Sequence, residues 1–386
     1  FDLKRGAADL VPDTLVAAKS MPAGGAQEAQ AVHFAWALEA DAALTQAAPH
    51  HAESREFWTQ LDASQAKSGW DFTPTTDGAL VRISLRQSGK ARSLAASDLQ
   101  LRVDGQVRDA ASVIEHLAGD AELKSVGTHF SEGTVVFQLA KGLAGKRIGV
   151  ALPDSASSAL MHVLEPDSPV SMALAADRIQ AVPGGRIMLD AGFMDGDKKL
   201  PAGRMAGLVT APDGRSFDVD FRVDKSGRAT ASFQLPEDAI GGMEPWEIHV
   251  FGAAKLGRGQ QVLRDARTAV MVSLPSARLL GVAGLKRKDG GLNFDLPVEV
   301  AADGRFEVRG TLHGTDKSGQ LRPMAIAHGA DVLKAGAGTL ALRFPADVLN
   351  AKLGAPYALR DLSLSDQTRL SVNEHRHEAL DIPVLP

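Results

Sequence analysis

Residues 217–224 read Phe-Asp-Val-Asp-Phe-Arg-Val-Asp, and this stretch decides the fold class. Every second residue is apolar, and charged residues fill the positions between them. Successive side chains of a β-strand point to opposite faces, so the apolar side chains all share one face of a strand, whereas a helix would scatter them around its axis. The stretch therefore predicts a half-buried antiparallel strand.

The same alternation recurs along the chain. The clearest apolar positions are Val81, Ile83 and Leu85; Leu99, Leu101 and Val103; Val135, Phe137 and Leu139; Trp246, Ile248 and Val250; Phe294, Leu296, Val298 and Val300; Phe306 and Val308; and Leu340, Leu342 and Phe344. Turn motifs such as Pro212-Asp213-Gly214 lie between these runs and supply the backbone chemistry of tight turns. Long helical periodicity is absent after residue 165, so the pattern predicts antiparallel β-sandwiches and disfavours parallel α/β folds.

The length of the chain predicts several domains. At about 100–200 residues per domain, 386 residues are too many for one sandwich. Polar, proline-containing stretches at 165–169 and 274–276 suggest boundaries, giving modules at 1–165, 166–275 and 276–386. We therefore predict a mainly all-β chain of three tandem β-sandwich modules, of which the last two are immunoglobulin-like in size.

The first module differs from the other two. It is expected to contain a strand at 32–38, a helix beginning near Ser54, and a second helix from an Asp109 N-cap to Gly119. Phe57 and Leu61, four residues apart, support the first of these helices. We therefore expect a β-sandwich with short helical insertions, preceded by an extended amino-terminal arm.

Composition excludes several classes of function. The chain has no cysteine, which excludes disulfides, thiolate catalysis and cysteine-ligated metals. The net charge is −5 and basic residues cluster only at Lys286-Arg287-Lys288, so nucleic acid is not an expected partner. No apolar run is long enough for a membrane span. The chain begins at Phe1 without an initiator Met, which predicts export to the periplasm or beyond.

Several motifs carry a resemblance to known proteins. Val182-Pro183-Gly184-Gly185 and Trp246-Glu247-Ile248-His249-Val250 resemble the immunoglobulin-like and macroglobulin-like modules of bacterial surface proteins. Together with the segments 32–38, 53–58 and 78–84, they make the whole chain resemble an uncharacterised family of exported proteobacterial proteins, a domain of unknown function. The resemblance implies export and tandem modules, and it brings no activity or site residues with it.

Acidic residues form one candidate metal site. Asp190, Asp195 and Asp197 lie around one loop, and carboxylates that converge on a turn are what calcium requires. The spacing does not match an EF-hand, and an acidic, solvated hairpin turn is the alternative interpretation. Calcium is therefore the one cofactor that the sequence suggests.

Histidine pairs form two further candidates. His375 and His377 share one face of a strand and could supply two nitrogen ligands to zinc or copper, although no third ligand is identifiable from sequence. An exposed polar strand end is the alternative. His50 and His51, followed by Glu53, are similar, and their alternative is a polar loop before a helix.

Four tryptophans are candidate ligand contacts or core residues. Trp36 and Trp246 occupy apolar positions of alternating strands, so both are expected in cores. Trp58 and Trp70 are better placed for the surface and are the candidate ligand-binding residues, with packing of the first helix against its own sandwich as the alternative.

Catalytic motifs are missing from the sequence. It contains no Gly-x-Ser-x-Gly elbow, His-Glu-x-x-His or P-loop. We therefore predict a noncatalytic exported protein that binds a protein or glycan ligand, with specificity in the amino-terminal module. A hydrolase or lyase acting on extracellular polymer is one alternative, and a periplasmic chaperone or inhibitor of a secreted enzyme is another.

Overall fold

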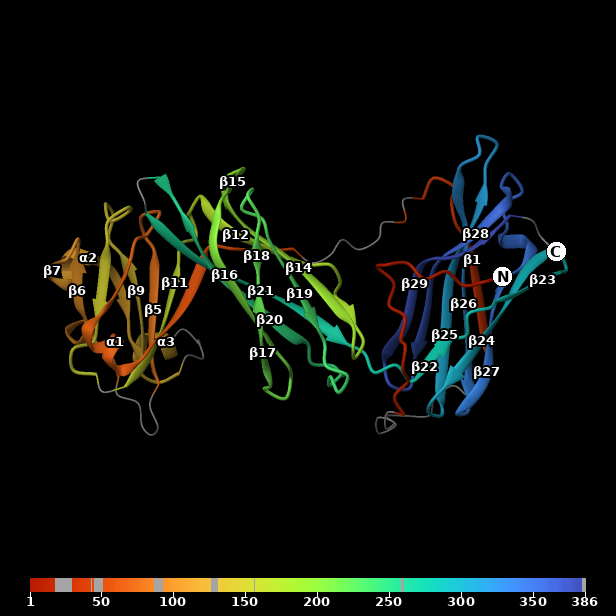
Figure 1. Ribbon diagram of the computed structural model, residues 1–386, viewed down its shortest axis with the longest axis horizontal. Coiled ribbons are helices and arrows are strands. Elements are labelled where there is room, and N and C mark those ends of the chain that lie inside the picture. Colours follow the sequence, from red (N-terminus) through yellow and green to blue (C-terminus); the bar gives the residue numbers. More distant parts are fainter. Residues whose placement is uncertain are drawn as a thin grey trace.

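The computed structural model describes residues 1–17, 30–42, 44, 51–86, 93–125, 131–155, 157–257 and 260–383. Three lobes lie in a row, and nearly all regular structure in them is β-strand (Figure 1). Each lobe has its own hydrophobic core, with members from residues 57–163, 170–272 and 277–382. We call them the amino-terminal, middle and carboxyl-terminal domains. The expected all-β, multi-sandwich architecture is confirmed.

The amino-terminal domain contains short α-helices as well as strands. Its elements are β3 (Glu56–Leu61), α1 (Ala63–Ser68), β4 (Trp70–Phe72), β5 (Leu80–Arg86), η1 (Ala96–Asp98), β6 (Gln100–Val103), β7 (Gln106–Arg108), α2 (Ala110–Val113), β8 (Ile114–Ala118), α3 (Asp120–Ser125), β9 (Thr134–Leu139), β10 (Ile148–Ala151) and β11 (Ser158–Leu164). A four-stranded sheet, β4-β10-β6-β7, covers the strands β3, β11, β5, β9 and β8 of a larger sheet.

The two expected helices of this domain are corrected by the structure. Phe57 and Leu61 lie on strand β3, not on a helix, and both are buried. A spacing of four residues fits one helical turn and also two strand repeats, so it does not distinguish them. The helix starts later, where Asp62 caps the backbone N–H of Gln65. Asp109 caps α2 as expected, but that helix ends after one turn and β8 continues the chain.

The middle domain is a sandwich of two sheets. Its elements are β2 (His51–Ser54), β12 (Val170–Ala176), β13 (Gln180–Ala181), β14 (Arg186–Asp195), β15 (Lys198–Leu200), β16 (Ala202–Thr210), β17 (Ser216–Asp220), β18 (Arg222–Val223), β19 (Ala229–Gln234), β20 (Trp246–Lys255) and β21 (Gln261–Val272). The alternating stretch 217–224 is split at Phe221: β17 pairs with β16 in one sheet, and β18 pairs with β19 in the other. The stretch therefore connects the two layers.

The carboxyl-terminal domain is completed by the beginning of the chain. Its elements are β1 (Val32–Ala37), β22 (Ala277–Leu279), β23 (Gly284–Lys288), β24 (Gly291–Val300), β25 (Gly304–Thr315), β26 (Leu321–Leu333), β27 (Gly336–Phe344), η3 (Ala346–Val348), β28 (Gly354–Asp366) and β29 (Ser371–Ile382). One sheet has the order β1-β26-β25-β28-β29, and β22, β23 and β27 pair with β24 in the other.

The strand expected at 32–38 forms as β1, and its hydrogen-bonded partner β26 lies in the carboxyl-terminal domain. β1 pairs with β26 over six residues, and Ala35 packs on the carboxyl-terminal core. Residues 1–17, which we call the strap, also lie here: Leu3 and Leu10 make backbone hydrogen bonds to Gly281 and His375. The red start of the chain accordingly lies beside its blue end (Figure 1). Pairing between distant strands decides this placement, and local alternation carries no information about it.

The amino-terminal and middle domains share one sheet. β3 pairs with β21 at Glu56 and Asp265, which joins the strands of both domains into a ten-stranded sheet. β2 adds to β12 in the other sheet of the middle domain. The sheets therefore continue from one domain into the other across the boundary near residue 165.

A buried ion pair fastens this junction. The side chains of Arg264 and Glu165 are each only 1% exposed, and Nη2 of Arg264 lies 2.5 Å from Oε2 of Glu165. Arg264 also donates to the carbonyl oxygen of Val170 at 3.0 Å and to Oγ of Ser168 at 2.9 Å, while Glu165 accepts from the backbone N–H of Thr75. Since buried charges are tolerated only when they are paired and hydrogen-bonded, this network fixes the two domains together.

Candidate functional site

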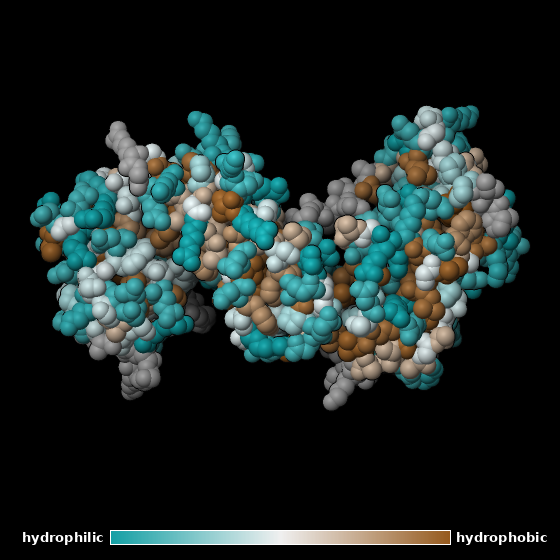
Figure 2. Space-filling view, in the orientation of Figure 1, coloured by the Kyte–Doolittle hydropathy of each residue, from teal (hydrophilic) through white to brown (hydrophobic). Residues whose placement is uncertain are grey.

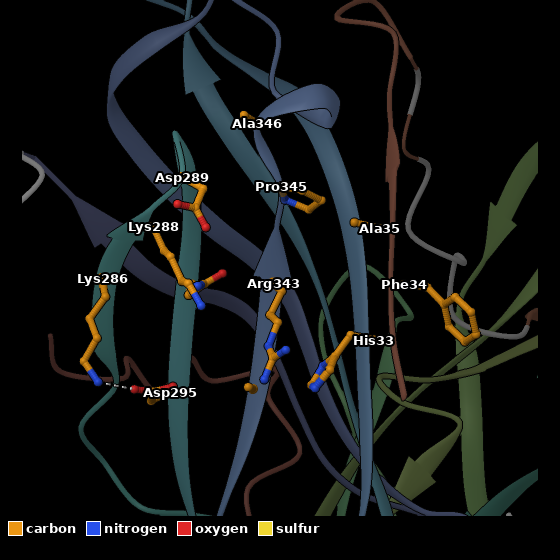
Figure 3. Close-up of a pocket in the computed structure, with 12 residues that line it drawn as sticks. His33, Phe34, Ala35, Lys286, Lys288, Asp289, Asp295, Arg343, Pro345 and Ala346 are labelled. Carbon is orange, nitrogen blue, oxygen red and sulfur yellow. Dashed lines mark hydrogen bonds and ion pairs between the residues drawn. The ribbon is translucent and has the colours of Figure 1, made fainter. Parts of the chain in front are cut away.

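The surface around β1 combines the features of a binding site. β1 is the edge strand of the five-stranded sheet, so alternate side chains point to opposite sides of one exposed strand. His33 points toward Arg343, whereas Phe34 points away from it on the other side of β1 (Figure 3). Phe34 also borders the charged pocket beside His33, so a charged pocket and an aromatic surface meet along this strand.

The aromatic surface is formed by Phe34 and Trp36. These side chains are 56% and 51% exposed, their ring centroids are 6.0 Å apart, and their planes differ by 22°. His328 meets Trp36 edge-on at 5.3 Å. The expectation that Trp36 lies in a core is therefore wrong, because the small Ala35 is the residue of β1 that packs inward. Brown, hydrophobic residues are visible on the surface of the carboxyl-terminal lobe, on the right of the view (Figure 2).

Polar side chains next to the aromatic pair are held in place by one another. Nδ1 of His328 lies 2.5 Å from Oε1 of Glu307, and Gln367 donates to Oε2 of the same carboxylate at 2.6 Å. Trp36 and Phe34 lie opposite Ile326 and His328 in the β1–β26 register. The aromatic rings therefore adjoin a preorganised polar group.

A pocket of about 510 Å³ lies next to His33 of β1. It is lined by His33, Phe34, Ala35, Lys286, Lys288, Asp289, Asn293, Asp295, Ala341, Arg343, Pro345 and Ala346 (Figure 3). Lys286 is paired with Asp295 at 2.9 Å, but within the described part of the chain Lys288 and Arg343 make no ion pair. Burial, and secondarily the Arg343 guanidinium, lowers the pKa of His33. The pocket offers two unpaired cations to an anionic group.

The three candidate calcium ligands do not converge. Asp190 and Asp195 are five residues apart on β14, so they point to opposite faces and lie about 17 Å apart along the strand. Asp190 is instead ion-paired with Arg228. Asp190 and Asp197 line a second pocket, of about 430 Å³, and Asp195 is not among its lining residues. Because calcium needs about six to eight oxygen atoms around one point, this arrangement opposes the predicted site.

The histidine candidates have different outcomes. His51 and Glu53 line the same second pocket, and His50 lies outside the described residues. His375 and His377 share a face as expected, and the structure adds Asp361 from the neighbouring strand. In the described part of the chain this is the one group of three potential ligands, all within 4.8 Å of one another. Asp361 was missed because it lies far from the pair in sequence.

Trp58 and Trp70 do not form a joint site in the structure. The Trp58 ring stacks on His162 at 4.0 Å, and the guanidinium of Arg82 lies 4.4 Å from its centroid. Trp70 packs against the core beside Phe57. Both side chains are half-buried, so their role as ligand contacts stays a prediction. The sequence missed the exposed pair on β1, because alternation does not reveal which face of an edge strand is covered.

Comparisons with known proteins agree with the fold. The chain is similar to a DUF4785 family protein from Legionella pneumophila, with 17% identity, coverage of 97% of this chain and 99% of that chain, and a TM-score of 0.70. Native α2-macroglobulin from E. coli matches with 14% identity and a TM-score of 0.31, over 80% of this chain and 20% of that chain. No curated protein matches. Among the described residues, no helix has the length and apolar character of a membrane span.

Two family models match separate parts of the chain. Residues 24–165 match the N-terminal domain of DUF4785, and residues 276–383 match its C-terminal domain, both described as domains of unknown function. The two matched segments together cover more than half of the sequence and leave the middle domain between them. The chain therefore belongs to the DUF4785 family.

Proposed function

We propose that this protein is a noncatalytic, exported multi-domain protein that binds an acidic glycan at the surface around β1. The observation that carries the proposal is the exposed pair Phe34 and Trp36, whose ring planes are nearly parallel. Sugars stack their apolar C–H faces on aromatic rings and present hydroxyls to nearby polar side chains. His328 and Glu307 supply such polar groups beside the rings.

Charge across the strand favours an acidic glycan. Lys288 and Arg343 lie on the pocket side of β1, and a saccharide that crosses this edge would place a carboxylate near both. An arginine guanidinium binds a carboxylate through two parallel hydrogen bonds, which gives direction as well as charge. The proposal thus places specificity in the carboxyl-terminal domain, in contrast to the amino-terminal module expected from sequence.

The ionisable groups nearby support binding without catalysis. A glycosidase needs a carboxylic acid with a raised pKa next to its substrate. Burial raises the pKa of Glu374, but this carboxyl group is buried and ion-paired with Arg376 on β29. Of the carboxylates at the binding surface, Glu307 and Asp295 are engaged by neighbouring side chains, and Asp289 also lines the pocket.

Affinity electrophoresis with immobilised polysaccharides tests the proposal. The full chain is expected to be retarded by at least one acidic probe among polygalacturonate, alginate and heparin, and not by dextran or amylose. Trp36→Ala should weaken this binding by at least about tenfold, because it removes the larger ring of the platform. Its stability should change little, since the side chain is exposed.

Phe251→Ala is the matched control, because Phe251 is a 44% exposed aromatic residue of the middle domain. It should bind like the unmodified chain. Replacing Lys288 and Arg343 by Gln should remove the preference for acidic over neutral probes. Failure of all acidic probes to retard the chain would overturn the proposal, and so would unchanged binding by Trp36→Ala.

A further inference from the structure

A distortion in β28 points to a second site, at the opposite edge of the sheet that carries β1. Asp361 has φ of +48°, a left-handed conformation that non-glycine residues seldom adopt inside a strand. Against β25, Arg360 pairs with Thr311 and Ser363 with Arg309, so Gly310 faces two residues of β28. This is a β-bulge, and bulges that redirect a side chain concentrate at functional sites.

The bulge brings Asp361 to a pair of histidines on β29. Oδ1 of Asp361 lies 3.5 Å from Nδ1 of His377 and 3.8 Å from Nε2 of His375. Zinc bonds of 2.0–2.1 Å in a tetrahedral site place ligand atoms about 3.4 Å apart, so the observed separations are close to those of a bound site. The centroids of the two imidazole rings are 4.5 Å apart, and one nitrogen of each ring lies within 4.8 Å of the other and of a carboxylate oxygen of Asp361.

The strap is hydrogen-bonded to β29, the strand that carries His375 and His377. The backbone N–H of His375 donates to the carbonyl oxygen of Leu10 at 2.8 Å, and Leu10 donates back to His375 at 2.9 Å. Oδ1 of Asp9 accepts from the backbone N–H of His377 at 2.9 Å, and its other oxygen accepts from Gly6. These bonds hold the backbone that carries both imidazoles.

Solvent can reach the three side chains. Asp361, His375 and His377 are each 30% exposed, so an ion can enter without unfolding of the domain. Two imidazoles and one carboxylate form a donor set of intermediate hardness, which suits zinc, copper(II) and nickel better than calcium or magnesium. The absence of cysteine from the chain leaves nitrogen and oxygen as the donors for such ions.

We propose that Asp361, His375 and His377 bind one divalent transition-metal ion, with zinc as the representative ion. Three protein ligands leave a fourth tetrahedral position for water or for a ligand atom from a partner. The site lies on β28 and β29, whereas the proposed glycan surface lies on β1, so the two proposals fail independently.

Isothermal titration of the chelator-treated full chain with zinc chloride tests this proposal. One tightly bound equivalent is expected, together with a higher midpoint of thermal unfolding in the presence of zinc. Cobalt(II) should give the visible absorption bands of a tetrahedral ion. His375→Ala should weaken zinc binding by at least about 100-fold, since losing a ligand costs more than losing a neighbour that supports it.

The variant Asp361→Asn removes a metal ligand and should leave the fold of the strand unchanged. Asn also tolerates the left-handed conformation, so the bulge should persist while zinc binding weakens by about tenfold. His116→Ala, an exposed histidine on β8, is the control and should bind zinc normally. The proposal is overturned if the unmodified chain binds no zinc, or if His375→Ala and Asp361→Asn bind it as tightly as the unmodified chain does.

Discussion

Replacing Arg264 by Leu is expected to lower the free energy of unfolding by about 3–5 kcal/mol, because Glu165 then stays buried without its partner. The guanidinium also donates to Ser168 and Val170, so its replacement removes two further buried hydrogen bonds. Urea denaturation, combined with hydrogen exchange of peptides from β3 and β21, measures the change and locates it at the junction.

Two further variants test whether the loss of stability comes from leaving a buried charge unpaired or from removing any charged residue. Lys334→Ala removes the surface ion pair between Lys334 and Asp303, whose side chains are 83% and 56% exposed. It should leave the free energy of unfolding nearly unchanged, because solvent screens this pair. The double variant Arg264→Met with Glu165→Leu should be more stable than Arg264→Leu, because no unpaired charge remains. Equal losses in the single and double variants would refute this account of the junction.

Trp246→Ala is expected to destabilise the middle domain by about 3–5 kcal/mol, through lost burial and the cavity that the indole leaves behind. The ring is fully buried, stacks on Phe217 at 5.9 Å, and donates from Nε1 to the carbonyl oxygen of Ile240 at 2.8 Å. Hydrogen exchange of peptides from β20 reports the loss within this domain.

Trp246→Phe is the matched variant for this position. It keeps most of the apolar volume and leaves the Ile240 carbonyl without its indole donor, so its cost should be about 1–3 kcal/mol. A result in which Phe costs as much as Ala would assign the effect to the hydrogen bond rather than to packing. A loss below about 1 kcal/mol for Ala would contradict the buried position of the ring.

Local alternation predicted much of the strand content. Trp246, Ile248 and Val250 were expected to share one face of a strand, and all three are fully buried on β20. The two-residue repeat of a strand depends only on neighbouring residues, so a single sequence is enough to reveal it. The same logic placed His375 and His377 on one face of β29, and this half of the candidate metal site is confirmed as a geometric arrangement.

Long-range pairing explains what the sequence did not reveal. The partner of β1 is β26, hundreds of residues away, so no local pattern could place Phe34 and Trp36 on the carboxyl-terminal domain. Asp361 joins the histidines through a bulge, which depends on how β25 and β28 pair. The buried partner of Glu165 is likewise on β21, although the sequence around residue 165 resembles an ordinary linker.

The strap and β1 also determine how the molecule is assembled and how it would carry mechanical load. During synthesis they are made before the amino-terminal and middle domains, whereas their partners β26 and β29 are made after them, so these two domains can close before the carboxyl-terminal domain does. A pull applied between residues 1 and 383 would act on the carboxyl-terminal domain alone. The other two domains would lie in a side loop without tension until the strap and β1 detach.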